Sequence, residues 1–405
     1  MKRSPVKPHL TGPEGSPTVA RGMQRDAWLV FAAKSTRTFC YGALGVLVPV
    51  HLVRLGMDAR GLGLAVTLTL VSSAALTFAV QRPSRRWGPR VALVGLAGLS
   101  VVAGVLFLAA REAWMVVVAA MLGNLAVGTG ETGPFQALEQ VVVTRASTRD
   151  ALTRTLSLYN LVGYVASALG AALIARLPDS PRDVFALFLV GALVQVATYA
   201  RMRTVAPVTP PQRAASSAPS RPLVRRLAAL FALDSLAGGF VIQSMVTYWF
   251  YTRFGLDLTQ LGWIFFGTQI LSGLSLLLAA RLAPRLGLVN TMVFSHLISN
   301  VLLIAVALAP TALAAVALLL ARHLLSQMDL PTRQTFLMLA VEDHEREHAA
   351  TLTNTSRTLA QSVSPTLTGW IMQGLSLSAP FILGGGLKIV YDVLLYVTIR
   401  NVRTR

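Results

Sequence analysis

The apolar residues of this 405-residue chain fall into blocks of about 20 residues, and this block length limits the possible folds more than any other feature. A helix of about 20 residues spans the hydrocarbon core of a bilayer, whereas a transmembrane β-strand needs about half that length. The blocks show little alternation of polar and apolar residues, so we predict helices. Twelve blocks run approximately over residues 28–52, 62–80, 91–110, 113–143, 152–175, 184–202, 227–251, 261–280, 289–309, 311–337, 350–374 and 380–399.

The composition independently indicates a membrane protein. Hydrophobic residues make up 54% of the chain and charged residues 13%, against about 25% charged residues in an average soluble protein. A soluble chain this apolar would expose large hydrophobic patches. The first block lacks a small-residue cleavage pattern, so we expect a retained helix and not a secretory signal.

The net charge of +19 would suit a nucleic-acid-binding protein, but the basic residues are distributed as in a membrane protein. With twelve spans, both termini and alternate loops lie on one side. The loops on the other side hold only six of the 36 lysines and arginines, namely Arg54, Arg60, Arg111, Arg176, Arg182 and Arg253. This asymmetry predicts cytoplasmic termini. We expect the basic side to attract anionic lipid head groups, and we expect no nucleic-acid partner because no basic stretch has interleaved aromatic residues.

The chain contains an internal repeat. Residues 56–58 (Gly-Met-Asp), followed by Leu62-Gly63, return in the second half as residues 255–257 (Gly-Leu-Asp), followed by Leu261-Gly262. An Arg-x-Gly turn follows each copy, at Arg86-Trp87-Gly88 and at Arg285-Leu286-Gly287. The repeat predicts two similar halves, each with one apolar block between the paired marks.

A segment rich in proline, alanine and serine separates the two halves. It runs from Thr204 to Val224 and cannot bury enough apolar area to fold alone, so it is predicted to be a cytoplasmic linker. The predicted organisation is a cytoplasmic tail, an N-terminal six-helix bundle, the linker and a C-terminal six-helix bundle, over residues 1–26, 27–203, 204–224 and 225–401.

The pattern over residues 27–401 resembles the major facilitator superfamily, whose members have two six-helix halves joined by a cytoplasmic loop. The resemblance implies an all-α membrane protein with twelve transmembrane helices in two pseudo-symmetric six-helix bundles. The family's loop motif Gly-x-x-x-Asp-Arg-x-Gly-Arg-Lys is matched at Arg86, Gly88 and Arg90, while Gln81 and Arg85 replace its first Gly and its Asp. On this resemblance the cytoplasmic gating loops are predicted to comprise Arg82, Arg86, Gly88, Arg90, Arg285 and Gly287.

Residues 330–334, with Asn354 and Arg357, look like a bacterial efflux-permease-like subgroup of that family. The resemblance implies a secondary transporter in a bacterial inner membrane that exports a small organic solute by alternating access, with H+ as the coupling ion. In the family's helix 4 signature, Asn124 replaces the arginine associated with proton coupling. We expect a monomer without cofactors, and no direct ATP drive because no G-x-x-x-x-G-K loop is present.

Several ionisable residues lie within apolar blocks, where a charge costs at least about 2.5 kcal/mol. The resemblance implies that helices 1, 4, 7 and 10 line a central cavity, and all four carry such residues. The predicted substrate and ion site comprises Lys34, Arg37, Glu131, Asp234, Gln243, Arg322, His323 and Asp329. Glu131 or Asp234 is the candidate proton acceptor, and Arg37 and Arg322 are candidate anchors for an anionic solute.

Some of these groups also have purely structural interpretations. Arg37 and Glu131 would form a bridge that only orients helices 1 and 4. In helix 12, Lys388 and Asp392 are spaced i,i+4 and are expected to neutralise each other. In helix 9, the pair at positions 296 and 300, a histidine and an asparagine, is expected to make packing contacts or interhelical hydrogen bonds.

One motif favours an enzyme. Residues 344–348 read His344-Glu345-Arg346-Glu347-His348 and satisfy H-E-x-x-H, the zinc motif of metalloproteases. An intramembrane metalloprotease is therefore one alternative, and a non-transporting membrane sensor on the same fold is another. The motif lies in a short acidic loop without an evident third ligand, so an acidic N-terminal cap of helix 11 is the preferred interpretation. We expect no metal and no enzymatic activity.

Overall fold

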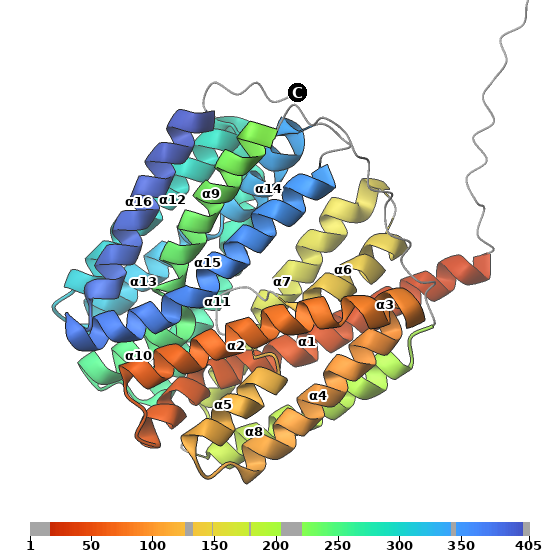
Figure 1. The fold of residues 1–405 in the computed structure, drawn as a ribbon, viewed down its shortest axis with the longest axis horizontal. Helices are drawn as coiled ribbons and strands as arrows, with labels where there is room; N and C mark the ends of the chain where they lie inside the picture. Colours follow the sequence, from red (N-terminus) through yellow and green to blue (C-terminus); the bar gives the residue numbers. More distant parts are fainter. Residues whose placement is uncertain are drawn as a thin grey trace, which may run out of the picture.

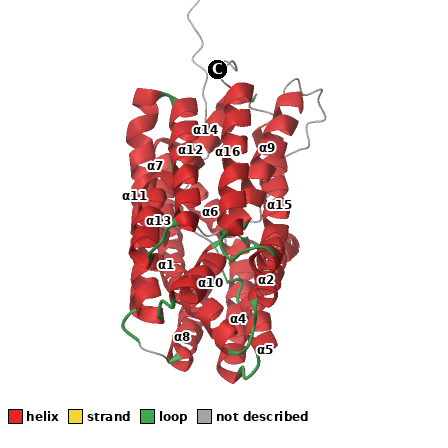
Figure 2. Cartoon of the chain, turned by 90° about the vertical axis from the view of Figure 1, so that its left-hand side faces the viewer, coloured by secondary structure: helices red, strands yellow, loops and turns green. Residues whose placement is uncertain are grey.

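The structure, a computed structural model, describes residues 17–125, 133–147, 149–177, 180–203, 221–341 and 346–399, whose regular elements are all helices (Figure 2). The first half contains α1 (Pro17–Arg54), α2 (Ala59–Ala79), α3 (Gln81–Trp87), α4 (Pro89–Ala109), α5 (Ala113–Leu122), α6 (Pro134–Ala146), α7 (Arg149–Ile174) and α8 (Pro181–Ala200). The second half contains α9 (Arg221–Gly239), α10 (Gln243–Phe254), α11 (Leu258–Leu286), α12 (Leu288–Leu308), α13 (Ala312–Ser326), α14 (Asp329–Ala340), α15 (Arg346–Gly374) and α16 (Ala379–Ile399).

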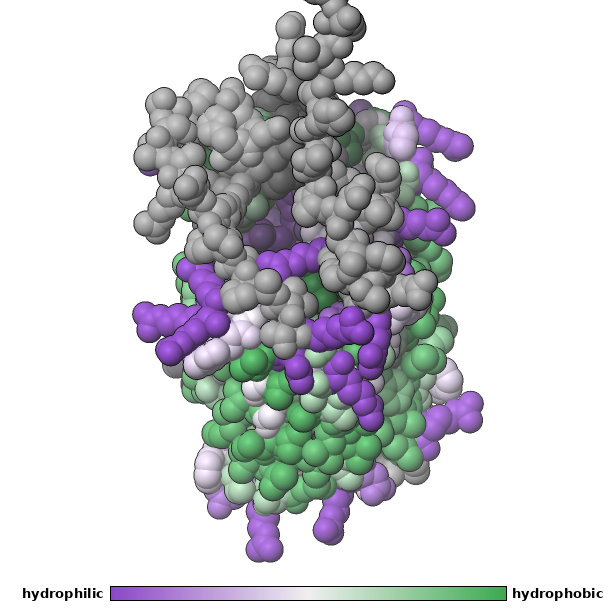
Figure 3. All heavy atoms as spheres, turned by 90° about the vertical axis from the view of Figure 1, so that its right-hand side faces the viewer, coloured by the Kyte–Doolittle hydropathy of each residue, from purple (hydrophilic) through white to green (hydrophobic). Residues whose placement is uncertain are grey.

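Among the described residues, ten helical segments are long and apolar enough to cross a membrane. They correspond to ten of the twelve predicted blocks. The other two blocks are α5 with α6, which are separated by residues outside the described ranges, and α15, which is long enough but less apolar. Figure 3 shows hydrophobic side chains gathered in a broad band with hydrophilic side chains at its borders, as a lipid-facing surface requires.

The repeated Gly and Asp marks are helix-capping signals. Gly56 and Gly255 have φ values of +88° and +66°, which end α1 and α10 at a low conformational cost. The Asp58 and Asp257 carboxylates then cap α2 and α11, because each accepts a 2.8 Å hydrogen bond from the backbone N–H three residues later. The Gly61 N–H bonded to Asp58 lowers the pKa of that carboxyl from its ordinary value. The sequence repeat therefore has matching backbone geometry in the two halves.

Two predicted helices are interrupted. Block 227–251 forms α9 and α10, which are separated by a turn at residues 240–242. Block 311–337 forms α13 and α14, which are separated at residues 327–328. Pro331 has no N–H to donate to the carbonyl of Gln327, so one helical hydrogen bond is missing at this break. Interrupted helices are tolerated at membrane depth where they are buried in protein or line a cavity.

The two halves pack together at one end of the bundle. We call this the Gly56 end, with the turns at residues 55–58, 255–257 and 375–378, and we call the opposite end, with α3, the Gly88 end. Between the halves, α2 packs against α15, α7 against α11, and α1 against α10. At the Gly88 end, α3 and α6 pack against first-half helices and α14 against second-half helices. Figure 1 shows the first-half helices and the second-half helices diverging toward the Gly88 end.

Two glycines of the sequence repeat allow the backbones of the halves to touch. An ideal Cβ on Gly63 would lie 2.3 Å from the carbonyl oxygen of Pro365 in α15. An ideal Cβ on Gly262 would lie 2.7 Å from the carbonyl oxygen of Ala171 in α7. Any larger residue would clash with backbone at both positions, so glycine is required for the halves to close at the Gly56 end.

A cation–π contact accompanies each of these approaches. The Arg60 guanidinium lies 4.2 Å from the Trp370 ring centroid, across the α2–α15 contact. The Arg176 guanidinium lies 5.8 Å from the Trp263 ring centroid, across the contact between α7 and α11. At exposed sites such contacts contribute about 0.5–1 kcal/mol each. The two cation–π contacts therefore lie at pseudo-symmetric positions, as the two glycines do.

Candidate functional site

Arg37 of α1 is fully buried and paired with Glu139 of α6. Arg37 Nη1 lies 3.0 Å from Glu139 Oε1 and Nη2 lies 2.6 Å from Oε2. The Tyr159 hydroxyl of α7 donates to the same carboxylate at 2.6 Å, and the Tyr199 hydroxyl of α8 also donates to it. The Phe135 ring lies 4.5 Å from the guanidinium. The carboxylate thereby holds four helices of the first half together.

The bridge predicted between Arg37 and Glu131 stays a prediction. Glu131 lies outside the described residues, and the carboxylate bonded at both guanidinium nitrogens is that of Glu139. The two glutamates are eight residues apart, about two helical turns, so helical spacing alone places both on a similar face of a continuous helix. Glu139 is therefore a residue that sequence reasoning missed.

Lys34 belongs to the same first-half cluster. Its ammonium lies 3.8 Å from the Tyr159 ring centroid. A Cβ on Gly163 of α7 would lie 2.7 Å from Lys34 Cε, so the glycine leaves room for the lysine stem. Lys34 is 2% exposed, and its charge is buried against an aromatic face.

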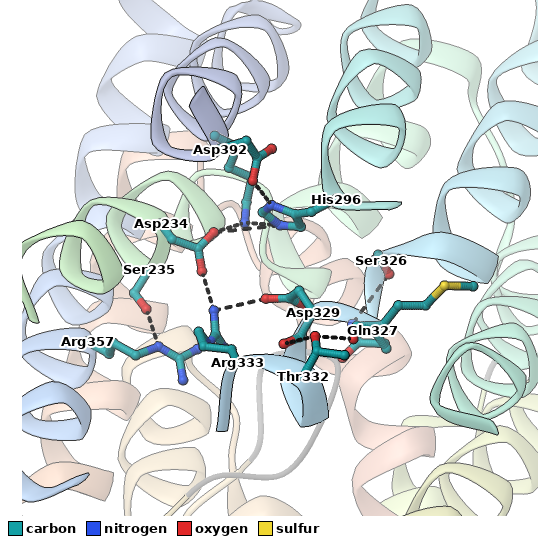
Figure 4. Close-up of polar contacts among 12 residues, drawn as sticks. Asp234, Ser235, His296, Ser326, Gln327, Asp329, Thr332, Arg333, Arg357 and Asp392 are labelled. Carbon is teal, nitrogen blue, oxygen red and sulfur yellow. Dashed lines mark hydrogen bonds and ion pairs between the residues drawn. The ribbon is translucent and has the colours of Figure 1, made fainter. Parts of the chain in front are cut away.

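Asp234 of α9 is at the centre of a second buried cluster, in the other half (Figure 4). Lys388 Nζ of α16 lies 2.6 Å from Asp234 Oδ1, and Arg333 Nη1 of α14 lies 3.1 Å from Oδ2. Arg333 Nη1 also lies 2.9 Å from Asp329 Oδ2, one turn earlier in α14. Asp234 therefore links α9 to both α14 and α16. Arg333 lies within the stretch of residues 330–334 but was not predicted as a site residue.

His296 of α12 extends this cluster to another carboxylate. Its Nδ1 lies 2.7 Å from Asp392 Oδ1, and the Asn300 amide donates to Asp392 Oδ2 at 2.9 Å. Its Nε2 lies 3.4 Å from Lys388 Nζ and 3.7 Å from Asp234 Oδ1. The interhelical hydrogen bonds predicted for positions 296 and 300 are confirmed. The predicted neutralisation between Lys388 and Asp392 is wrong, because Lys388 pairs with Asp234 and Asp392 with His296.

Several hydrogen bonds lie at the boundary between the halves, and the Thr67 hydroxyl of α2 accepts two of them, from the backbone N–H and the hydroxyl of Thr366 in α15. Gln269 Nε2 of α11 donates to Gln243 Oε1 of α10 at 3.3 Å, and a Cβ on Gly45 of α1 would lie 2.9 Å from Gln243 Nε2. The Tyr164 hydroxyl of α7 donates to Gln327 Oε1, at the break between α13 and α14, at 3.1 Å. Gln243 therefore lies where the first and second halves meet, and its role in substrate binding stays a prediction.

Arg322 and His323 are neighbours in α13, and their side chains differ in hydrogen bonding. His323 Nδ1 lies 3.0 Å from the Ser272 hydroxyl of α11. Arg322 Nε is buried and, among the described residues, has no hydrogen-bond partner. A buried guanidinium nitrogen without a partner is costly, and this leaves Arg322 able to bind an added acceptor.

Seven of the eight predicted site residues lie in the described structure, and Glu131 does not. Lys34 and Arg37 lie in the first-half cluster, Asp234 and Asp329 in the second-half cluster, and Gln243 at the boundary.

The comparison with protein families decides the class of the chain. Its sequence matches the profile of the Major Facilitator Superfamily over residues 29–322 and 227–405. The chain belongs to the Major Facilitator Superfamily. It is therefore a multi-pass secondary transporter of a small-molecule solute and not an enzyme.

Individual proteins are similar to this chain over nearly its whole length. The uncharacterized membrane protein YJR124C of Saccharomyces cerevisiae is 23% identical over 417 residues, which cover 92% of this chain and 93% of the yeast protein. The crystal structure of the human organic anion transporter MFSD10 matches with a TM-score of 0.67 and 15% identity, over 92% of this chain and 99% of that one. A D-xylose-proton symporter matches with a TM-score of 0.69 and 14% identity, over 96% of this chain and 99% of that one. The likenesses to solved structures show the shared fold.

The two Arg-x-Gly loops have the same glycine backbone conformation in both halves. Gly88 and Gly287 have φ values of +87° and +85°, and they separate α3 from α4 and α11 from α12. Arg90 Nη2 donates to the Ala200 carbonyl at 2.6 Å, which ties the start of α4 to the end of α8. The gating role of these loops, with Arg82, Arg86 and Arg285, stays a prediction.

The H-E-x-x-H match gains no support. His344 and Glu345 lie outside the described residues, as does the side chain of His348. In the ranges that the structure describes, no three His, Cys, Asp or Glu side chains are grouped to hold a metal ion. Membership of a transporter superfamily decides against the metalloprotease alternative.

Proposed function

We propose that this superfamily member exports a small polar or anionic organic solute across a bacterial inner membrane by alternating access, coupled to protons. The observation that carries the proposal is the packing of the two halves at the Gly56 end, with separate packing of each half at the Gly88 end. In alternating access the halves rock about a central site so that one end closes while the other opens. The arrangement fits one of the two states of such a cycle.

The side of the membrane reached by each end follows from the basic residues. The loops of the Gly56 end carry few lysines and arginines, and those of the Gly88 end carry many, which supports a cytoplasmic Gly88 end. The state described here then opens toward the cytoplasm, where an exporter takes up its solute. Bacterial location and export are supported by the efflux-permease-like stretch at residues 330–334.

The solute class is supported by the two candidate anion anchors, which differ in their surroundings. Arg37 is already held by Glu139 and Tyr199, so its guanidinium has a bidentate internal partner. Arg322 has a buried Nε without a partner in the described structure. A carboxylate or phosphate on the solute would complete that hydrogen bonding, because a guanidinium binds planar anions with two parallel bonds. We therefore assign the anchor role to Arg322 and a structural role to Arg37.

Transport assays on reconstituted vesicles test this assignment. The protein in vesicles is screened with a panel of radiolabelled carboxylates, phosphates, amino acids and neutral sugars. Arg322→Ala is expected to raise the half-saturating concentration of the transported solute about tenfold or more, because a hydrogen bond to a charged group contributes about 1.5–3 kcal/mol. Arg322→Lys keeps the charge but loses the bidentate geometry, so a smaller loss is expected. Equal transport by wild type and Arg322→Ala would exclude the anchor role, and a membrane sensor would show no solute uptake at all.

A further inference from the structure

His296, outside the predicted site, lies between two carboxylates that differ in their partners (Figure 4). Asp234 is compensated by two cations, with Lys388 at 2.6 Å and Arg333 at 3.1 Å. Asp392 is instead held by the imidazole, at 2.7 Å, and by the Asn300 amide, at 2.9 Å. A carboxylate paired with two cations is a poor proton acceptor. A carboxylate that accepts a hydrogen bond from an imidazole makes that imidazole a better proton acceptor.

The hydrogen bonds around His296 indicate its tautomer. The Asp392 carboxylate can only accept, so its 2.7 Å contact with Nδ1 places a ring proton there. The Asn300 amide nitrogen lies 3.2 Å from the same Nδ1 and donates to Asp392 Oδ2. The Lys388 ammonium can only donate, and its 3.4 Å contact with Nε2 is compatible with a lone pair on that nitrogen. In this tautomer the basic lone pair lies on Nε2, on the side of Lys388 and Asp234.

Several other charged and titratable groups surround this position. The elements packed near α12 present Lys388, Asp392 and the Tyr391 phenol from α16, Asp329 and Arg333 from α14, Arg322 and His323 from α13, Asp234 from α9, and Arg357 of α15, which is bonded to Ser235. From α11, the charged residues Arg281 and Arg285 are exposed near its end. The added proton would thus enter a cluster in which Lys388 is the cation in contact with Nε2 and Asp392 is the anion in contact with Nδ1.

We propose that His296, oriented by Asp392, binds the coupling proton of this transporter, in place of the predicted acceptors Glu131 and Asp234. A proton from water adds to the lone pair of Nε2, and the hydrogen bond from Lys388 to Nε2 breaks. The new N–H is directed toward Asp234 Oδ1, which is 3.7 Å away and is the same oxygen that Lys388 contacts. Loss of the proton to water restores the neutral ring. This inference rests on the proposed proton-coupled transport and specifies its proton site.

The proton would act on the contact between α9 and α16. Lys388 and the protonated His296 compete for Asp234 Oδ1, so proton binding weakens the Lys388–Asp234 pair that joins these helices. Beyond its break, α9 continues as α10, which packs against α1 in the other half. Protonation of His296 therefore weakens a contact of α9, and the next helix after α9, α10, lies at the boundary between the halves.

A titration of the imidazole nitrogens tests the proton site without any solute. Protein labelled with ¹⁵N-histidine in lipid nanodiscs is titrated by NMR from about pH 5 to about pH 8, the range of histidine ionisation. The His296 signals are identified by their loss in His296→Gln. At high pH we expect the Nδ1–H tautomer, with protonation of Nε2 within the range. Asp392→Asn is expected to lower the midpoint by about one pH unit or more, because it removes the adjacent negative charge.

Lys388→Gln should move the same midpoint in the opposite direction, since it removes the adjacent cation. His51→Gln serves as the matched control that leaves it unchanged, because His51 lies in the first half, where its ring packs against Phe185. The proposal is overturned if His296 does not titrate in this range, or if Asp392→Asn and Lys388→Gln shift it in the same direction. Absence of solute uptake with this titration intact would instead count against the proposed transport function, so the two failures are distinguishable.

Discussion

Replacement of Gly63 by valine is expected to separate the two halves at the Gly56 end. The new Cβ would lie 2.3 Å from the Pro365 carbonyl oxygen, and backbone on a packed helix cannot yield as a flexible side chain does. Overpacking of this kind costs about 1–3 kcal/mol, enough to shift a two-state equilibrium by about fivefold to a hundredfold toward the state with that end open. A cysteine at Gln243, where α10 meets α1, should then react faster with a water-soluble maleimide added from the Gly56 side.

Gly262→Val should produce the same shift, because its Cβ would lie 2.7 Å from the Ala171 carbonyl oxygen at the pseudo-symmetric contact. Gly98→Val is the matched control, since a Cβ at that position meets nothing within 4 Å. If Gly98→Val changed the labelling rate as much as Gly63→Val, the effect would not arise from the contact between the halves.

Replacement of Glu139 by alanine is expected to destabilise the folded protein by about 3–5 kcal/mol, because it leaves the buried Arg37 guanidinium without its carboxylate. Unfolding in mixed detergent micelles, followed by helical circular dichroism, measures this loss. Arg37→Ala should be similarly destabilising, since Glu139 would then be the uncompensated charge.

The double variant Arg37→Met with Glu139→Leu should recover much of the stability, because a buried ion pair is often replaced by apolar residues at little cost. The pairing of Arg37 with Glu131 makes a different prediction, that Glu131→Ala carries the larger loss. A folded Glu139→Ala protein as stable as the wild type would contradict the structural role assigned to this pair.

Features set by local sequence were predictable. Block length gave the spans, and the Gly-x-Asp marks gave the caps, because a positive φ at Gly56 and a side-chain cap at Asp58 depend on a few neighbouring residues. The break between α13 and α14 also has a local cause in Pro331, although block 311–337 was predicted as one helix.

Partners of the buried charges were not predictable in the same way. Spacing places Lys388 and Asp392 one turn apart, and an i,i+4 pair contributes only about 0.2–0.5 kcal/mol. A buried carboxylate such as Asp234 costs far more without a cation, so the tertiary pairing of Lys388 with Asp234 overrides the local one. Helix spacing gives the face of each residue, but the sequence does not give the rotation of one helix against another.

Distances between spin labels at the two ends test the central claim, that the halves close one end while they open the other. Cysteines replace Leu55 and Leu375 at the Gly56 end, and Arg86 and Arg285 at the Gly88 end, on a chain whose one native cysteine, Cys40, is buried. In the Gly63→Val background, the account predicts a longer Leu55–Leu375 distance together with a shorter Arg86–Arg285 distance. Two distances that stay fixed, or that lengthen together, would contradict it.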